Sequence, residues 1–158
     1  MIQLEALTLG YGQQILLDHV SANLDGGGLI ALLGRNGSGK STLLRATAGL
    51  GTIKSGRILL AGKDLAELRP EELARTVSFV TTEKVRIPNL KCRDVVALGR
   101  APYTNWVGRL QPQDREIVAK SLALLDMSAY AERTMDQMSD GECQRIMIAR
   151  ALTQDTPI

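Results

Sequence analysis

The stretch Gly34-Arg-Asn-Gly-Ser-Gly-Lys-Ser41 decides the fold of this 158-residue chain. It follows a short apolar run at residues 29–33, Leu-Ile-Ala-Leu-Leu, which is typical of a buried strand. It precedes residues 42–48, which favour a helix that Gly49 would end. A strand, a glycine-rich loop and a helix in this order predict an α/β domain.

The quoted stretch fits the phosphate-binding pattern G-x-x-x-x-G-K-[ST]. Glycines let the backbone curl around phosphates, while its N–H groups and the helix N-terminus attract negative charge. Lys40 adds a positive charge, and Ser41 offers a hydroxyl to Mg²⁺. The alternative is a glycine-rich turn that binds nothing. We expect a nucleotide here, with contacts from the loop and the first helical turn: Asn36, Gly37, Ser38, Gly39, Lys40, Ser41 and Thr42.

Composition excludes several other classes of protein. The formal net charge is only +2 and aromatic residues make up 3% of the chain, which argues against a nucleic-acid-binding surface. Cys92 and Cys143 have no metal-ligand or redox spacing, and His19 stands in no ligand cluster. Neither a signal peptide nor a run of about 18 apolar residues is present. We therefore expect a protein of the reducing cytosol that does not itself cross a membrane.

The remaining pattern predicts a sheet followed by helices. Expected strands lie at residues 2–9, 15–24, 56–60 and 77–80, and expected helices at 71–75, 94–98, 113–125 and 141–152. We predict one domain over residues 1–158. Its parts are a β subdomain with the phosphate-loop core (1–90), a helical subdomain (91–139), and a helix that returns to the core (140–158).

A second motif narrows the class. Residues 138–145, Met-Ser-Asp-Gly-Glu-Cys-Gln-Arg, and the following Ile-Met-Ile-Ala-Arg-Ala-Leu152 resemble the signature segment and helix of the ATP-binding cassette (ABC) family. The family pattern is Leu-Ser-Gly-Gly-Gln. This chain keeps Ser139 and Gly141 but has Met138, Asp140 and Glu142. The resemblance implies a P-loop NTPase core with an N-terminal antiparallel β subdomain and an inserted α-helical subdomain.

In that family the signature faces the γ-phosphate of ATP held by a second copy of the protein. The resemblance therefore implies that Ser139, Gly141 and Glu142 present a hydroxyl, N–H groups and a helix dipole to that phosphate. The alternative is a simple helix cap, with Glu142 in the first turn and no ligand. Asp140 is an anion close to that phosphate and could weaken the contact.

Two weaker positions are interpreted by the same resemblance. Tyr11 stands where the family stacks an aromatic ring on adenine, although a tyrosine packed on the sheet edge is the alternative. Thr82, with Glu83 beside it, stands where the family has a glutamine that contacts Mg²⁺. Plain loop residues are an equal alternative there. The implied metal contacts are Ser41 and Thr82, and the implied cofactors are ATP and Mg²⁺.

Residues 94–103, Asp-Val-Val-Ala-Leu-Gly-Arg-Ala-Pro-Tyr, resemble the importers of iron-siderophore, haem and cobalamin. An amphipathic helix stopped by Gly99 and Pro102 would explain the same residues in any branch. Tyr103 and Trp106 either pack within the helical part or form part of the groove for the permease. The importer resemblance implies transmembrane permease subunits, a second copy bound head to tail, a substrate-binding protein, and a place on the cytoplasmic face of the inner membrane.

The family continues beyond the long helix with the Walker B strand and its Asp, a catalytic Glu and a switch His. This sequence ends at Ile158, so we expect an incomplete cassette without catalytic residues, little ATP hydrolysis and marginal stability. Two alternatives remain for its function. One is a soluble ABC protein that acts on ribosomes or DNA, and the other is a nucleotide-binding module without hydrolysis.

Overall fold

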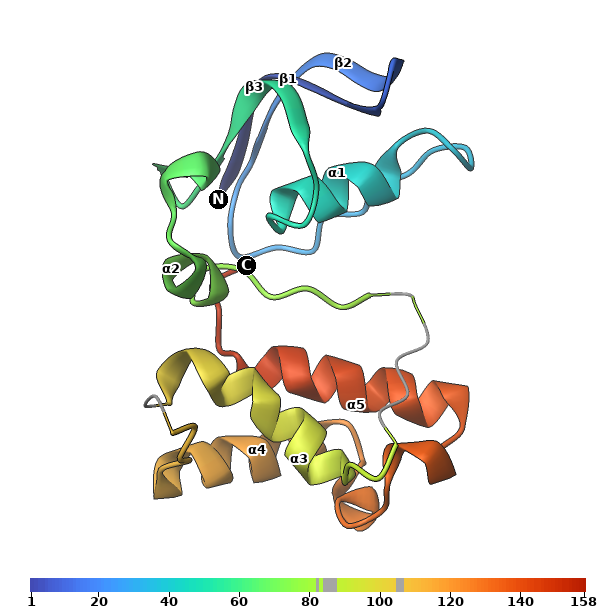
Figure 1. The fold of residues 1–158 in the computed structure, drawn as a ribbon, viewed down its shortest axis with the longest axis vertical. Coiled ribbons are helices and arrows are strands. Elements are labelled where there is room, and N and C mark those ends of the chain that lie inside the picture. The colour runs from blue at the N-terminus through green and yellow to red at the C-terminus, as the bar shows by residue number, and fades with distance from the viewer. Residues whose placement is uncertain (82, 84–87, 105–106) are drawn as a thin grey trace. The chain divides into compact units, whose positions relative to one another are not determined.

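The computed structural model of the chain describes residues 1–81, 83, 88–104 and 107–158 (Figure 1). The chain forms two compact units. The first comprises Met1–Val77 together with Pro157–Ile158, and the second comprises Ser78–Thr156. The division falls before the boundary near residue 90 that the sequence predicts, and the single-domain interpretation stays a prediction.

An antiparallel sheet forms the frame of the first unit. Its strands are β1 (Ile2–Tyr11), β2 (Gln14–Leu24), β3 (Ile53–Leu60) and β4 (Lys63–Asp64), in the order β2-β1-β3-β4. Tyr11 pairs with Gln14, so a two-residue turn joins β1 to β2. The three longer strands confirm the predicted ones, and β4 is an addition.

Helix α1 (Lys40–Thr47) packs on this sheet, and α2 (Pro70–Ala74) begins with a proline at its first position. A proline is tolerated there because the first N–H of a helix has no intrahelical partner. The buried core combines apolar residues of β1 and β3 with one residue of α1 and one that follows α2: Leu4, Leu7, Leu9, Ala46, Ile58, Leu60 and Val77. Ile158 packs against the same core from the end of the chain.

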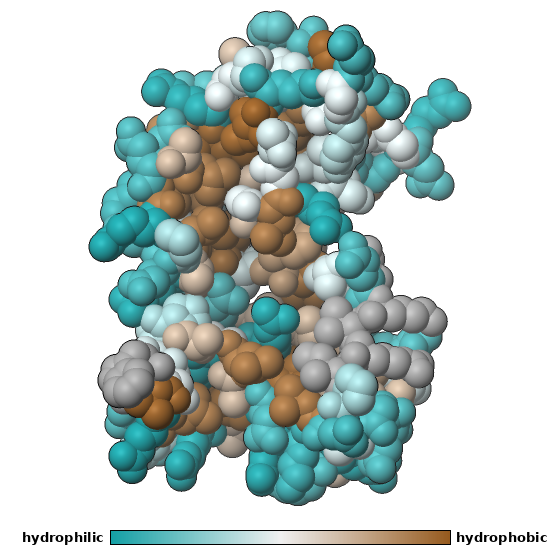
Figure 2. All heavy atoms as spheres, in the orientation of Figure 1, coloured by the Kyte–Doolittle hydropathy of each residue, from teal (hydrophilic) through white to brown (hydrophobic). Residues whose placement is uncertain are grey.

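Two predicted strands are wrong. Residues 29–33 and 77–80 form no strand, and Leu29 and Leu33 are 101% and 88% exposed instead of buried. A central strand needs hydrogen-bonding neighbours, and within the described ranges the four-stranded antiparallel sheet offers none to these segments. Apolar side chains consequently stay uncovered on the first unit, as the brown surface in the upper part of Figure 2 shows.

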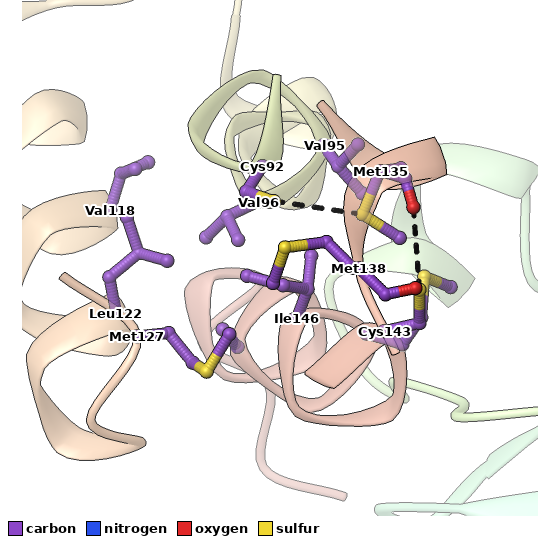
Figure 3. Close-up of a cluster of buried hydrophobic side chains, with 12 residues drawn as sticks. Cys92, Val95, Val96, Val118, Leu122, Met127, Met135, Met138, Cys143 and Ile146 are labelled. Atoms are coloured by element: carbon purple, nitrogen blue, oxygen red, sulfur yellow. Dashed lines mark hydrogen bonds between the residues drawn. The ribbon is translucent and has the colours of Figure 1, made fainter. Parts of the chain in front are cut away.

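Three α-helices lie in the described part of the second unit: α3 (Cys92–Ala97), α4 (Pro112–Leu124) and α5 (Asp140–Thr153). They confirm the predicted helices to within a few residues. Their apolar faces meet in one core, which is rich in sulfur: Cys92, Val95, Val96, Val118, Leu122, Met127, Met135, Met138, Cys143, Ile146, Met147 and Ala149 (Figure 3). No helix in the described ranges is both long enough and apolar enough to span a bilayer.

A buried polar network ties the C-terminal end of α5 to the other helices. Arg100, in the 3₁₀ helix η2 (Leu98–Tyr103), donates from Nε to Asp114 Oδ1 at 2.8 Å and from a second nitrogen to the Thr153 carbonyl at 2.9 Å. Gly99 lets η2 approach α5 closely, because a Cβ at Gly99 would overlap Thr153 Oγ1 and the Arg150 carbonyl. Residues 94–103 thus have a structural role in this unit.

Candidate functional site

Two glycines shape the phosphate loop. Gly37 and Gly39 have φ values of 80° and 88°, in the left-handed region that favours glycine. Gly39 is the N-cap of α1, and a Cβ on it would lie 3.3 Å from Leu17 Cγ. The loop therefore turns sharply into the helix at a point where a larger residue would be strained.

The side chain of Lys40 folds back over this loop. Its Nζ donates to the Gly34 carbonyl at 2.9 Å and to the Arg35 carbonyl at 2.7 Å. An ammonium group has three N–H donors, so one is left for a ligand. The two carbonyls thus hold a positive charge in place beside the N-terminus of α1.

A pocket of about 270 Å³ lies at this point. The first N–H groups of α1 have no acceptor within the helix, and the helix dipole adds positive potential to that of Lys40. Such a pocket suits a phosphate chain. Its walls come from the loop, the first turn of α1 and one residue of β2: Leu16, Asn36, Gly37, Gly39, Lys40, Ser41 and Thr42. Ser38 lies in the same loop, where its N–H donates to the Arg35 carbonyl.

Tyr11 lies beside this pocket at the end of β1. Its hydroxyl is 3.5 Å from Thr42 Oγ1, and the residue is 64% exposed. The ring is therefore open to solvent next to the first turn of α1, as a stacking surface has to be. Adenine stacking on it stays a prediction.

Ser41 is the predicted Mg²⁺ contact within the described residues, and its side chain is exposed at the start of α1. No group of three or more His, Cys, Asp or Glu residues in the described part of the chain could hold a metal ion. A lone hydroxyl still fits Mg²⁺, because that ion is usually bound by few protein ligands together with substrate phosphates and waters. Thr82, the second predicted contact, lies outside the described residues, as does Trp106.

The predicted signature residues lie at the N-terminus of α5. Ser139 is the N-cap, and its Oγ accepts from the Glu142 N–H at 3.4 Å. In return, Glu142 Oε2 accepts from the Ser139 N–H at 2.8 Å and from the Ser139 hydroxyl at 2.6 Å. The Ser139 hydroxyl is the main reason that the pKa of Glu142 lies below its usual value. Gly141 follows in the first turn, where a Cβ would meet nothing within 4 Å.

The phosphate loop belongs to the first unit and the signature residues to the second, and the structure shows each set by itself. Tyr103 packs within the second unit. Its hydroxyl donates to the Gln154 carbonyl at 2.9 Å, and the Arg100 guanidinium lies 4.0 Å from its ring centre.

Several contributors escaped the sequence analysis. Leu16 lines the phosphate pocket and Leu17 packs on Gly39, yet both are ordinary apolar residues of a strand. Tyr130 adds a hydrogen bond that lowers the pKa of Glu142. No sequence pattern marks these three residues, because each acts through its place in the fold.

Known proteins resemble this chain along its whole length. A family profile described as ABC transporter matches residues 17–158. An uncharacterized ABC transporter ATP-binding protein of Methanocaldococcus jannaschii is 39% identical over all 158 residues, which cover 54% of that protein. A probable siderophore transport system ATP-binding protein of Bacillus subtilis is 34% identical over 157 residues, 99% of this chain and 57% of that protein. The chain thus spans little more than half the length of these relatives.

Solved structures of ABC transporter proteins are also similar to this chain. A dimeric ABC transporter cassette superposes with a TM-score of 0.85 at 27% identity, covering 99% of this chain and 71% of the other. A putative metal-chelate type ABC transporter in an inward-facing conformation matches with a TM-score of 0.76 at 27% identity, covering 98% and 56% of the two chains. The phosphate loop, the capped signature helix and these likenesses together show that the chain belongs to the ABC transporter family.

Proposed function

We propose that this chain is the ATP-binding part of an ABC importer subunit that binds MgATP and, in the complete subunit, hydrolyses it to drive uptake of an iron-siderophore, haem or cobalamin. The observation that carries the proposal is the phosphate loop, where Lys40 and the N-terminus of α1 converge on one pocket. The residues Asn36, Gly37, Ser38, Gly39, Lys40, Ser41 and Thr42 bind the phosphates, Tyr11 stacks on adenine, and Ser41 and Thr82 contact Mg²⁺.

The importer assignment is supported by relatives. Besides the siderophore protein of Bacillus subtilis, a petrobactin import ATP-binding protein of Bacillus anthracis is 34% identical over 157 residues. In this proposal transmembrane permease subunits and a substrate-binding protein are the partners, at the cytoplasmic face of the inner membrane. Ser139, Gly141 and Glu142 face the γ-phosphate of ATP on a second copy.

Binding of MgATP is tested by titration calorimetry on three forms of the chain: wild type, Lys40→Ala and Lys120→Ala. Lys120 is an exposed residue of α4 in the second unit, so its variant loses the same charge but leaves the loop unchanged. We expect wild type and Lys120→Ala to bind alike and Lys40→Ala to lose binding. Far-UV circular dichroism shows whether each form is folded.

A phosphate-release assay on the same samples tests hydrolysis. Since the resemblance places the water-polarising carboxylate beyond α5, we expect the 158-residue chain to bind MgATP without releasing phosphate. A folded wild type that does not bind MgATP would refute the nucleotide site.

A further inference from the structure

The hydroxyl of Ser139 already has a partner in its own helix. Glu142 Oε2 lies 2.6 Å from this hydroxyl and 2.8 Å from the Ser139 N–H. A carboxylate can only accept, so the single hydroxyl proton of Ser139 points at Glu142. In this arrangement the proton is not available to a phosphate oxygen.

Charge adds to this competition. The hydrogen bonds from Ser139, with a further one from Tyr130, favour the ionised form of Glu142, and Arg145 on the same helix acts in the same direction. Asp140 is a second acid in this turn. A phosphate is also an anion that mainly accepts hydrogen bonds. It would therefore compete with the Glu142 carboxylate for one proton while being repelled by its charge.

The space around Gly141 leaves room for a group that approaches the first turn of α5. Its φ is not in the left-handed region, and a Cβ on it would meet nothing within 4 Å. Among the residues that the structure describes, nothing therefore requires glycine at the second position of α5. Its absent side chain leaves the backbone of the first turn open, which a ligand that approaches closely needs.

We propose that Glu142 is a positioning residue that holds Ser139 in a state closed to phosphate, so that nucleotide-driven pairing of two copies requires Glu142 to release the Ser139 hydroxyl. The proposal rests on the proposed function, since it concerns the signature residues that would face a second copy's ATP. It adds a built-in competitor to that contact.

The test compares wild type with Glu142→Gln. A glutamine has the same size, and its amide oxygen can still accept from the Ser139 N–H, but it carries no charge and its NH₂ group donates. Sedimentation velocity with increasing MgATP measures how much of the chain pairs. We expect Glu142→Gln to pair at a MgATP concentration lower by about tenfold, the size typical of one charge-assisted hydrogen bond.

Glu116→Gln is the matched control, because it removes one carboxylate from an exposed position of α4 in the same unit. It should pair as wild type does. A second comparison repeats Glu142→Gln in a Ser139→Ala background, where no hydroxyl can be released. The gain from Glu142→Gln should shrink there if it acts through Ser139.

A purely structural role for Glu142 makes the opposite prediction. Glu142→Gln would then weaken the cap, lower the melting temperature and leave pairing unchanged or weaker, which would overturn the proposal. So would a Glu142→Gln chain that binds MgATP but does not pair. Calorimetry on the same samples separates the two ideas, since loss of MgATP binding in wild type refutes the nucleotide site itself.

Discussion

Helices α1 and α5 both begin at a segment predicted to face phosphate, yet their N-termini are built in opposite ways. At α1 the N-cap is Gly39, no side chain caps the helix, and a lysine lies over the loop. At α5 the side chains of Ser139 and Glu142 cap each other's backbone N–H groups. The N-terminus of α1 is open to a ligand, whereas N–H groups at the N-terminus of α5 are hydrogen-bonded to the side chains of Ser139 and Glu142 until something displaces Glu142.

The largest expected effect concerns the other end of α5. Asp114 is 4% exposed and holds Arg100, which in turn bonds the last turn of α5. Asp114→Ala leaves a buried guanidinium without its carboxylate, so we expect the free energy of unfolding to fall by about 3–5 kcal/mol. Urea unfolding followed by circular dichroism measures this.

Glu116→Ala on the exposed side of α4 is the control and should change stability by about 0.5 kcal/mol or less. If Asp114→Ala changed stability as little, α5 would not depend on the buried pair for its position.

Next in size is a test of the open terminus at α1. Gly39→Ala places a Cβ in a left-handed backbone close to Leu17, so we expect a loss of about 1–2 kcal/mol in stability and about tenfold or more in MgATP affinity. Gly62 has a similar φ of 83° but open space around it. Gly62→Ala should therefore lose stability through the same backbone strain but bind MgATP with the affinity of wild type. Equal affinities for the two variants would show that the loop geometry does not matter for binding.

A smaller effect is expected at Gly141. Because a Cβ meets nothing there, Gly141→Ala should raise the free energy of unfolding by about 0.5–1 kcal/mol through lower entropy of the unfolded chain. Thermal unfolding checks this, with Gly99→Ala, which must overlap Thr153, as the destabilising counterpart. If Gly141→Ala were destabilised, a Cβ at this position would have to meet other atoms, contrary to the open space in the structure.

The smallest effect is a pH dependence of the closed terminus. The pKa of Glu142 is lowered in the folded chain, chiefly by the Ser139 hydroxyl. Its contribution to stability is thus fully present above the pKa that a glutamate has in the unfolded chain, and is lost as pH falls through the lower folded pKa. Unfolding between pH 3 and pH 7 should show a shallower loss for Ser139→Ala than for wild type. Identical slopes for the two proteins would show that the Ser139 hydroxyl does not stabilise the ionised form of Glu142.

Local signals predicted the helices well. Proline begins α2 and α4, and Ser139 with Glu142 forms the capping box of α5. The N-terminus of each of these helices is therefore specified by residues close to it in the sequence. Local signals wrongly predicted strands at residues 29–33 and 77–80. An apolar run shows that a segment seeks burial, but a strand also needs a neighbour, which only the rest of the fold supplies.

The same distinction applies to the candidate site. The candidate loop residues follow from spacing alone, because the pattern predicts which backbone groups and which lysine would meet a phosphate. What holds Lys40 in place, the carbonyls of Gly34 and Arg35, has no signature because every residue has a carbonyl. The bond from the Ser139 hydroxyl to Glu142 is likewise invisible until the rotamers of both side chains are known.

The contact of Ile158 with the core of the first unit has a consequence for the order in which the chain folds. All of Ser78–Thr156 is looped out when Pro157 and Ile158 join Met1–Val77, which lie far from them in the sequence. Closing so long a loop is slow compared with forming the local contacts of the helices. On refolding of the 158-residue chain from denaturant, we therefore expect the second unit to become protected against hydrogen exchange first, and the sheet to reach full protection later.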